Sequence, residues 1–250
     1  MQESYAGIGS ASMHRARIGS VGISLVETPY PRRVPESVAG HRASPVADAI
    51  RARRLIVVLR RVAPQARLLD LVDELEEAGA RIFEITFDAP EAADDLAAVR
   101  ERVGARSTSE IWLGAGTLRT IDQVGRAANA GAAFGVSPVL DRDVVACAAD
   151  LGLPFVPGAA TPTEVDLAWR LGATFVKIFP ASSFGPSHVR ELRGPMPEIE
   201  LIATGGIDGS NAPAFLAAGV TAVGIGSAIV RATPAERRAI VAATAAAPRP

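Results

Sequence analysis

The chain has 250 residues, of which 48% are hydrophobic, and its formal net charge at pH 7 is −1. This length and apolar content suffice for one large α/β domain with a buried core. The nearly neutral charge gives no reason to expect nucleic acid or an anionic membrane as a partner, and no apolar run reaches the roughly 18 residues of a membrane-spanning helix. The N-terminus lacks the layout of a signal peptide, and a single cysteine, Cys147, excludes an internal disulfide. We therefore expect a cytoplasmic protein.

The composition of residues 1–43 differs from that of the rest. They are rich in Ser, Gly, Arg and Pro and show no sustained helical or alternating pattern, which predicts a flexible N-terminal extension. From residue 44 to 250, short apolar runs alternate with amphipathic stretches that end in glycine. The eight runs predicted as strands are 55–60, 81–86, 111–115, 132–137, 154–158, 174–179, 200–204 and 222–226.

Near-continuous apolar strands joined by helices indicate a parallel sheet that is buried on both faces. Eight strand–helix units fit a single (β/α)₈ TIM barrel of small size. A doubly wound open sheet is the alternative, but it would place a glycine-rich turn after the first strand, where the chain reads VLRRVAP. In a barrel, functional side chains gather where the strands end and the following loops begin.

Lys177 and Glu84 both lie inside apolar strands. Of the 26 lysine and arginine residues, only Lys177 is a lysine, and only lysine offers a primary amine that can lose its proton and attack a carbonyl. One interpretation is therefore catalytic: a desolvated, neutral Lys177 condenses with a ketone while Glu84 moves protons. The other is structural, an interior ion pair between the two side chains. The position of Lys177 on the sixth predicted strand favours the catalytic interpretation.

Two glycine-containing loops follow the seventh and eighth predicted strands. One holds Gly205 and Gly206, and the other holds Gly226 and Ser227. In many barrels the backbone N–H groups of these two loops bind a phosphate. The sequence therefore indicates a phosphorylated ligand.

Two threonines follow the third and fifth predicted strands. Thr117, in LGAGTL, has small neighbours that let a ligand approach, and its hydroxyl can bond a carboxylate. Thr161 can act similarly, but TPTE also has the form of a capping box with Glu164. We weigh the helix cap slightly above a ligand role.

Six motifs occur in order between about residues 50 and 232: FEITFDAPEA, GAGTL, GVSPVLD, VPGAATPTE, FVKIFPASSFGP and TGGID. They resemble the motifs of the 2-keto-3-deoxy-6-phosphogluconate (KDPG) aldolase family, which includes the 4-hydroxy-2-oxoglutarate (KHG) and 2-dehydro-3-deoxy-6-phosphogalactonate aldolases. The resemblance implies a homotrimeric class I aldolase without metal or other cofactor. Its implied reaction is reversible cleavage of a 2-keto-3-deoxy-6-phospho sugar acid to pyruvate and D-glyceraldehyde 3-phosphate.

The resemblance also implies a role for each matching residue. Lys177 would form the Schiff base, and Glu84 would be the general acid and base, acting with a water. Thr117 would hold the keto-acid carboxylate, while Pro138 and Phe179 would line the pocket around the pyruvyl group. The residues implied to form the phosphate cradle are Gly205, Gly206, Gly226 and Ser227.

Asp88 departs from the gluconate-type pattern, in which an arginine four residues after the glutamate binds the substrate carboxylate. An acidic group there would repel a carboxylate. Galactonate-type members, which have a non-basic residue at this position and a segment similar to KIFPASSFGP, resemble the chain better. Arg60, ending the first strand, then supplies the positive charge. The run DAPE also predicts Asp88 as a helix N-cap, with Glu91 three residues on.

Two other functions fit the same phosphate loops. An isomerase, or a synthase of the thiazole- or thiamine-phosphate type, would not need Lys177. A non-catalytic sugar-phosphate binder would use the same mouth of the barrel without forming a covalent adduct.

Overall fold

The computed structural model describes residues 15–18, 21–24, 42–106 and 110–247. The chain divides into two units, Met1–Arg33 and Val34–Pro250. In the first, β1 (Arg15–Ile18) and β2 (Val21–Ser24) form an antiparallel hairpin that the composition did not predict. The remainder of the predicted flexible extension, up to residue 41, lies outside the described residues. None of the helices in the described ranges combines the length and hydropathy needed to cross a membrane.

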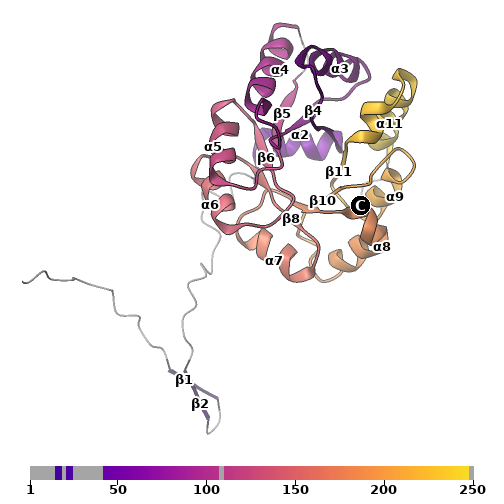
Figure 1. Cartoon of the computed structure of the whole chain (residues 1–250). Coiled ribbons are helices and arrows are strands. Elements are labelled where there is room, and N and C mark those ends of the chain that lie inside the picture. Colours follow the sequence, from indigo (N-terminus) through magenta and orange to yellow (C-terminus); the bar gives the residue numbers. More distant parts are fainter. Residues whose placement is uncertain (1–14, 19–20, 25–41, 107–109, 248–250) are drawn as a thin grey trace, which may run out of the picture. The chain divides into compact units, whose positions relative to one another are not determined.

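The second unit is a parallel sheet curled into a nearly closed barrel, with helices around it (Figure 1). Its strands are β3 (Leu55–Leu59), β4 (Ile82–Thr86), β5 (Trp112–Gly116), β6 (Phe134–Val136), β7 (Phe155–Val156), β8 (Gly158–Ala159), β9 (Val176–Ile178), β10 (Leu201–Thr204) and β11 (Ala222–Ile225). They are hydrogen-bonded in the order β7-β6-β5-β4-β3-β11-β10-β9-β8. The predicted α/β barrel is confirmed, and the doubly wound alternative is wrong.

The two edges of the sheet meet at the fifth predicted strand, residues 154–158, which the structure divides into β7 and β8. β7 and β8 are separated only by Pro157, whose ring leaves it without a backbone N–H to donate. β7 pairs with β6, and β8 pairs with β9. One interrupted strand therefore brings the two edges of the sheet together, and the nine short strands occupy the eight predicted positions.

The helices begin at several of the predicted signals. They are α2 (Pro45–Arg53), α3 (Gln65–Glu77), α4 (Ala92–Arg106), α5 (Ile121–Asn129), α6 (Arg142–Asp150), α7 (Pro162–Arg170), α8 (Ala181–Arg193), α9 (Ala212–Ala217), α10 (Ser227–Arg231) and α11 (Pro234–Ala246). The predicted capping box of Thr161 and Glu164 opens α7. The predicted N-cap at Asp88 is wrong: α4 begins at Ala92, and the Asp88 carboxylate binds arginines instead.

Alternation along the strands decides which side chains face the barrel interior. On β9, Val176 and Ile178 belong to the apolar core between the sheet and the helices, whereas Phe175 belongs to a separate inner cluster. Lys177 alternates with Val176 and Ile178 and therefore points into the barrel.

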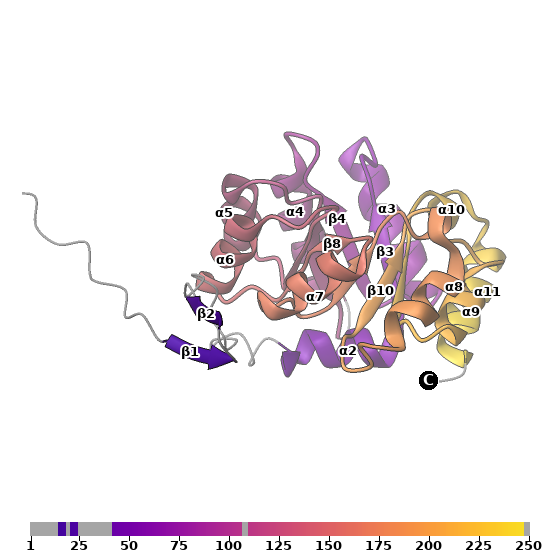
Figure 2. The same cartoon turned by 90° about the horizontal axis from the view of Figure 1, so that it is seen from below.

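The inner cluster fills the N-terminal half of the barrel. It joins residues of the strands, such as Ile56 and Ile202, to Val46, Ala47 and Ile50 of α2. α2 lies across this end of the strands (Figure 2). Apolar side chains of the described residues close this end, and the cavity of the interior opens at the end at which the strands terminate.

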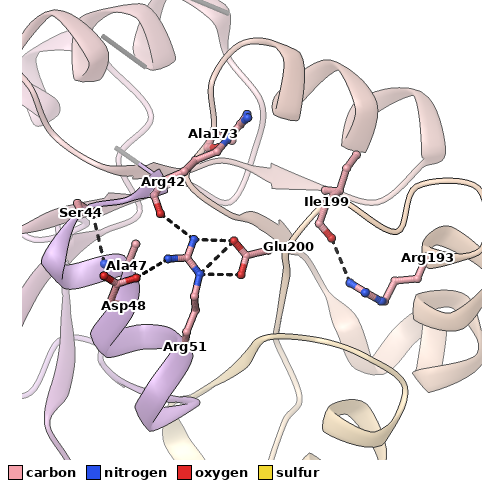
Figure 3. A network of polar contacts seen from close by, with 9 residues as sticks. All are labelled: Arg42, Ser44, Ala47, Asp48, Arg51, Ala173, Arg193, Ile199 and Glu200. Atoms are coloured by element: carbon pink, nitrogen blue, oxygen red, sulfur yellow. Dashed lines mark hydrogen bonds and ion pairs between the residues drawn. The ribbon is translucent and has the colours of Figure 1, made fainter. Parts of the chain in front are cut away.

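A polar network holds α2 against the barrel (Figure 3). Arg51 of α2 donates from Nε to Glu200 Oε1 at 2.9 Å and from Nη2 to Glu200 Oε2 at 2.6 Å. It also donates to Asp48 at 2.8 Å. Arg42, just before α2, lies 3.5 Å above the Trp169 ring. These contacts secure the helix that covers the apolar end of the barrel.

Candidate active site

A cavity of about 590 Å³ opens where the barrel strands end. Of the residues predicted for the site, those that line it are Arg60, Glu84, Thr117, Pro138, Lys177, Phe179, Gly205, Gly206, Gly226 and Ser227. Thr161 does not line it, and its hydroxyl hydrogen-bonds with Glu164 in the capping box, with oxygen atoms 2.9 Å apart. Residues from seven different strands and their loops thus converge on one cavity, while Thr161 caps α7.

Lys177 and Glu84 lie at the buried floor of this cavity, 6% and 2% exposed. Burial lowers the pKa of the Lys177 amine; the charge of Glu84 opposes this shift and that of Arg60 adds to it. Burial also raises the pKa of the Glu84 carboxyl, against the opposing effects of Lys177 and Arg60. Within the described residues, neither side chain has a hydrogen bond or an ion pair within 4.0 Å. Both groups are therefore shifted toward their neutral forms and remain available to a ligand.

The aromatic ring of Phe179 flanks the lysine. The Lys177 Nζ atom lies 4.8 Å from the ring centroid. Phe179 follows β9 two residues after Lys177, so both side chains share the inward face of that strand. The ring limits the access of water to the amine from this direction.

Gly116, at the end of β5, makes room for the Glu84 carboxylate. A Cβ atom built at Gly116 would lie 1.9 Å from Glu84 Oε1. The two residues belong to paired strands, with Gly116 opposite Thr86 and Gly114 opposite Glu84. Gly116, the second glycine of GAGTL, must therefore be glycine because the Glu84 carboxylate of β4 occupies the space that its Cβ would need.

Arg60 is held at the edge of the cavity by two partners. Its Nη1 donates to Asp88 Oδ2 at 2.7 Å, and its Nη2 donates to Thr117 Oγ1 at 3.2 Å. Burial raises the pKa of Asp88, but the Thr86 hydroxyl and the guanidinium groups of Arg60 and Arg61 outweigh it and keep that pKa below its ordinary value. Asp88 is therefore an ionised counter-ion of Arg60.

The two glycines after β10 are needed for packing. Gly205 and Gly206 have positive φ values of 89° and 72°, a conformation that favours glycine. A Cβ at Gly206 would lie 2.1 Å from Ser182 Oγ, and one at Gly205 would meet the Phe179 ring. Gly226 has no such close neighbour. The backbone of these loops is exposed to the cavity at the positions predicted for a phosphate.

Several lining residues were missed by the sequence reasoning: Val58, Arg119, Val139, Thr204, Ile207 and Gly224. Val58, Thr204 and Gly224 each precede a predicted site residue by two positions, so strand alternation was the signal that would have found them. The Thr204 hydroxyl is buried and has no hydrogen-bond partner among the described residues. It is thus a polar group available to a bound ligand.

A buried lysine amine and a buried carboxylate that line one barrel cavity are the groups that Schiff-base enzymes use. No group of three or more His, Cys, Asp and Glu within the described ranges is arranged to hold a metal ion. The model of the KDPG and KHG aldolase family matches residues 46–243, and the chain belongs to this family. It is therefore an aldolase, a carbon–carbon lyase.

Individual relatives agree with this assignment. The chain is 32% identical to the 2-dehydro-3-deoxy-6-phosphogalactonate aldolase of Escherichia coli K12, across 71% of this chain and 85% of that one. It is 35% identical to the 2-dehydro-3-deoxy-phosphogluconate aldolase of Treponema pallidum, across 65% and 74%. The structure of the KDPG aldolase of Legionella pneumophila holds pyruvate captured as a covalent carbinolamine. It is 25% identical to this chain with a TM-score of 0.70, and the match covers 82% of this chain and 98% of that one. Together they support class I aldolase chemistry for this chain.

Proposed function

We propose that this chain reversibly cleaves a 2-keto-3-deoxy-6-phospho sugar acid to pyruvate and D-glyceraldehyde 3-phosphate through a Schiff base on Lys177. The observation that carries the proposal is the environment of the chain's one lysine, which is buried at the floor of the cavity with a lowered pKa. The substrate class is supported by the names of the relatives.

The site residues account for each step. The neutral Lys177 amine attacks the C2 ketone, and loss of water from the carbinolamine gives an iminium ion. Glu84 takes the proton of the C4 hydroxyl through a water, and the C3–C4 electron pair moves into the iminium as the bond breaks. Glyceraldehyde 3-phosphate leaves. The enamine then takes a proton at C3, and water releases pyruvate and restores the amine.

The polar groups of the cavity indicate how the substrate is oriented. Arg60 and Thr117 lie at one side and bind the keto-acid carboxylate. The loops of Gly206 and Ser227 lie at the ends of β10 and β11 and receive the phosphate. This orientation places C2 of the substrate at Lys177, between the two anionic ends.

The galactonate-type substrate is the expected epimer. Asp88 replaces the arginine of gluconate-type members and is engaged with Arg60 and Arg61, so that Arg60 is the cation for the substrate carboxylate. The C4 hydroxyl distinguishes the two epimers, and its contacts with the cavity decide between them.

The first test is reductive trapping. The protein is incubated with pyruvate and sodium borohydride, and peptides are mapped by mass spectrometry. We expect a reduced pyruvyl group on Lys177 in the wild type and none on that peptide in Lys177→Arg. A folded wild type without an adduct would refute the Schiff base and would favour the phosphate-binding isomerase or synthase, or the silent binder.

The second test identifies the substrate. Both C4 epimers are supplied to the enzyme, and pyruvate release is followed with lactate dehydrogenase and NADH. We expect faster turnover of the galactonate-type epimer. A strong preference for the gluconate-type epimer would leave the mechanism intact and contradict the inference drawn from Asp88.

We also propose that the enzyme is a cytoplasmic homotrimer. The family resemblance supports the trimer, and a phosphorylated substrate that cannot cross a membrane unaided supports the location. Ile121, Val139, Leu151 and Phe184 are large apolar side chains exposed in this single chain. Sedimentation equilibrium measures the mass in solution, and a monomer would contradict this part of the proposal.

A further inference from the structure

A second cavity, of about 620 Å³, adjoins the catalytic one. The two share Val58, Arg60, Gly226 and Ser227 in their linings. The second cavity continues past Arg60, away from Lys177 and Glu84, which do not line it. It thus begins beside the loop of the proposed phosphate cradle and extends beyond the catalytic groups.

The lining of this second cavity is strongly basic. It contains Arg60, Arg61, Arg67 and Arg231, and no carboxylate among the described residues. The guanidinium groups come from three separate segments: the end of β3 and the loop after it, α3, and α10. We refer to these four arginines as the arginine pocket.

The carboxylates near the arginine pocket lie outside its lining. Asp88 is shared by Arg60 and Arg61, and Glu74 is shared by Arg67 and the buried Arg237. Asp70 acts on Arg67 from nearby, and Asp208 and Glu236 line a neighbouring cavity together with Arg231. Arg231 has no ion pair in the part of the chain that the structure describes. The four arginines of the pocket are therefore paired directly with only Asp88 and Glu74 among the described residues, which leaves guanidinium donors available to a ligand.

Arg61 adds a second, independent observation. Its φ is 48°, in the left-handed region that residues other than glycine rarely adopt. Its Nη2 donates to the backbone oxygen of Asp88 at 3.0 Å, and its Nε lies 3.2 Å from Asp88 Oδ2. The side chain is nevertheless 66% exposed. The backbone and Asp88 together fix this guanidinium while leaving it open to the cavity, and strained residues of this kind cluster at ligand sites.

We propose that the arginine pocket is a second anion site, which binds a small metabolite carrying a phosphate or several carboxylates. Guanidinium groups from three segments suit such oxyanions because each offers several fixed donors. Because Gly226 and Ser227 also line the catalytic cavity, an anion in the pocket lies beside the phosphorylated end of the substrate. The site itself does not depend on the proposed function; only this neighbouring position of the substrate phosphate rests on it.

The test counts bound anions with radiolabelled inorganic phosphate in equilibrium dialysis at low ionic strength. Arg61→Gly removes one guanidinium at a position whose φ suits glycine, so the fold is preserved. Arg231→Ser removes another from α10. Arg170→Ala is the matched control, because this exposed arginine lies on α7 and lines neither cavity.

We expect two phosphates per wild-type chain and per Arg170→Ala chain, and one per chain of Arg61→Gly or Arg231→Ser at the same phosphate concentration. A wild type that binds one phosphate and loses it in both variants would still support the arginine pocket and would contradict the phosphate cradle of the proposed function. Equal counts in the wild type and the two variants, including no binding at all, would overturn the arginine pocket. Trapping of pyruvate on Lys177 should be unchanged in Arg61→Gly and Arg231→Ser, which separates this site from the catalytic step.

Discussion

Gly116→Ala should slow catalysis by displacing the Glu84 carboxylate rather than by touching the substrate. The added Cβ would lie 1.9 Å from Glu84 Oε1, 2.5 Å from its Cδ and 2.7 Å from its Cγ, whereas Cβ atoms essentially never come within 3.0 Å of another atom. The carboxylate must therefore move by about 1.1 Å to restore that separation. A misplacement of about 1 Å costs roughly 10²-fold in rate, which corresponds to about 2.7 kcal/mol of transition-state stabilisation.

The assay is exchange of the pyruvate methyl protons with D₂O, followed by proton NMR. Exchange requires the Schiff base and proton transfer at C3, so it reports on Lys177 and Glu84 without depending on the sugar epimer. We expect Gly116→Ala to exchange about 10²-fold more slowly, and Glu84→Gln to show a loss of at least that size. Overpacking should also cost about 1–3 kcal/mol of stability, which urea unfolding measures.

Gly125→Ala is the control for replacing a glycine. Gly125 lies in α5, and a Cβ there meets nothing within 4 Å. This variant should exchange at the wild-type rate and gain about 0.5–1 kcal/mol of stability, because alanine is the better helix former. A folded Gly116→Ala protein that exchanges as fast as Gly125→Ala would refute the role assigned to the Glu84 position.

Three further predictions concern the buried pair and the covered end of the barrel. The rate of pyruvate trapping should rise with pH to a half-maximum below the ordinary lysine pKa of 10.5, because burial lowers the pKa of the attacking Lys177 amine. In Glu84→Gln the half-maximum should move lower still, since the negative charge of Glu84 raises that pKa. A half-maximum at or above pH 10.5 in the wild type would contradict the role of Lys177. The double variant Lys177→Met/Glu84→Leu should be inactive. In urea unfolding it should be as stable as the wild type or more stable by about 1–4 kcal/mol, because burying the two ionisable groups costs desolvation free energy. A large loss of stability would instead support a structural ion pair between Lys177 and Glu84. Arg51→Ala should lower the free energy of unfolding by about 1–2 kcal/mol, less than the loss of a fully buried ion pair, because Arg51 and Glu200 are both partly exposed. The rate of proton exchange should stay unchanged, because the bonds with Glu200 lie at the end of the barrel away from the cavity. A slower exchange would show that the two ends of the barrel are coupled.

The sequence by itself determined the features that depend on local pattern. Apolar strands spaced by amphipathic helices predicted the barrel, and Thr161 with Glu164 predicted the start of α7. These features were predictable because each reflects what a short segment must bury or hydrogen-bond, whatever the rest of the chain does.

Only the tertiary structure decided which strand ends meet. Asp88 reads locally as a helix cap, but the closed sheet brings it to Arg60, which lies 28 positions earlier in the chain. In the same way, Gly116 reads as a small residue near a ligand, and the pairing of β4 with β5 shows that it accommodates Glu84. The inner cluster beneath α2 and the arginine pocket likewise join segments that no local pattern relates. The curvature and register of the sheet set these contacts, because closing the barrel brings distant strand ends together around one axis.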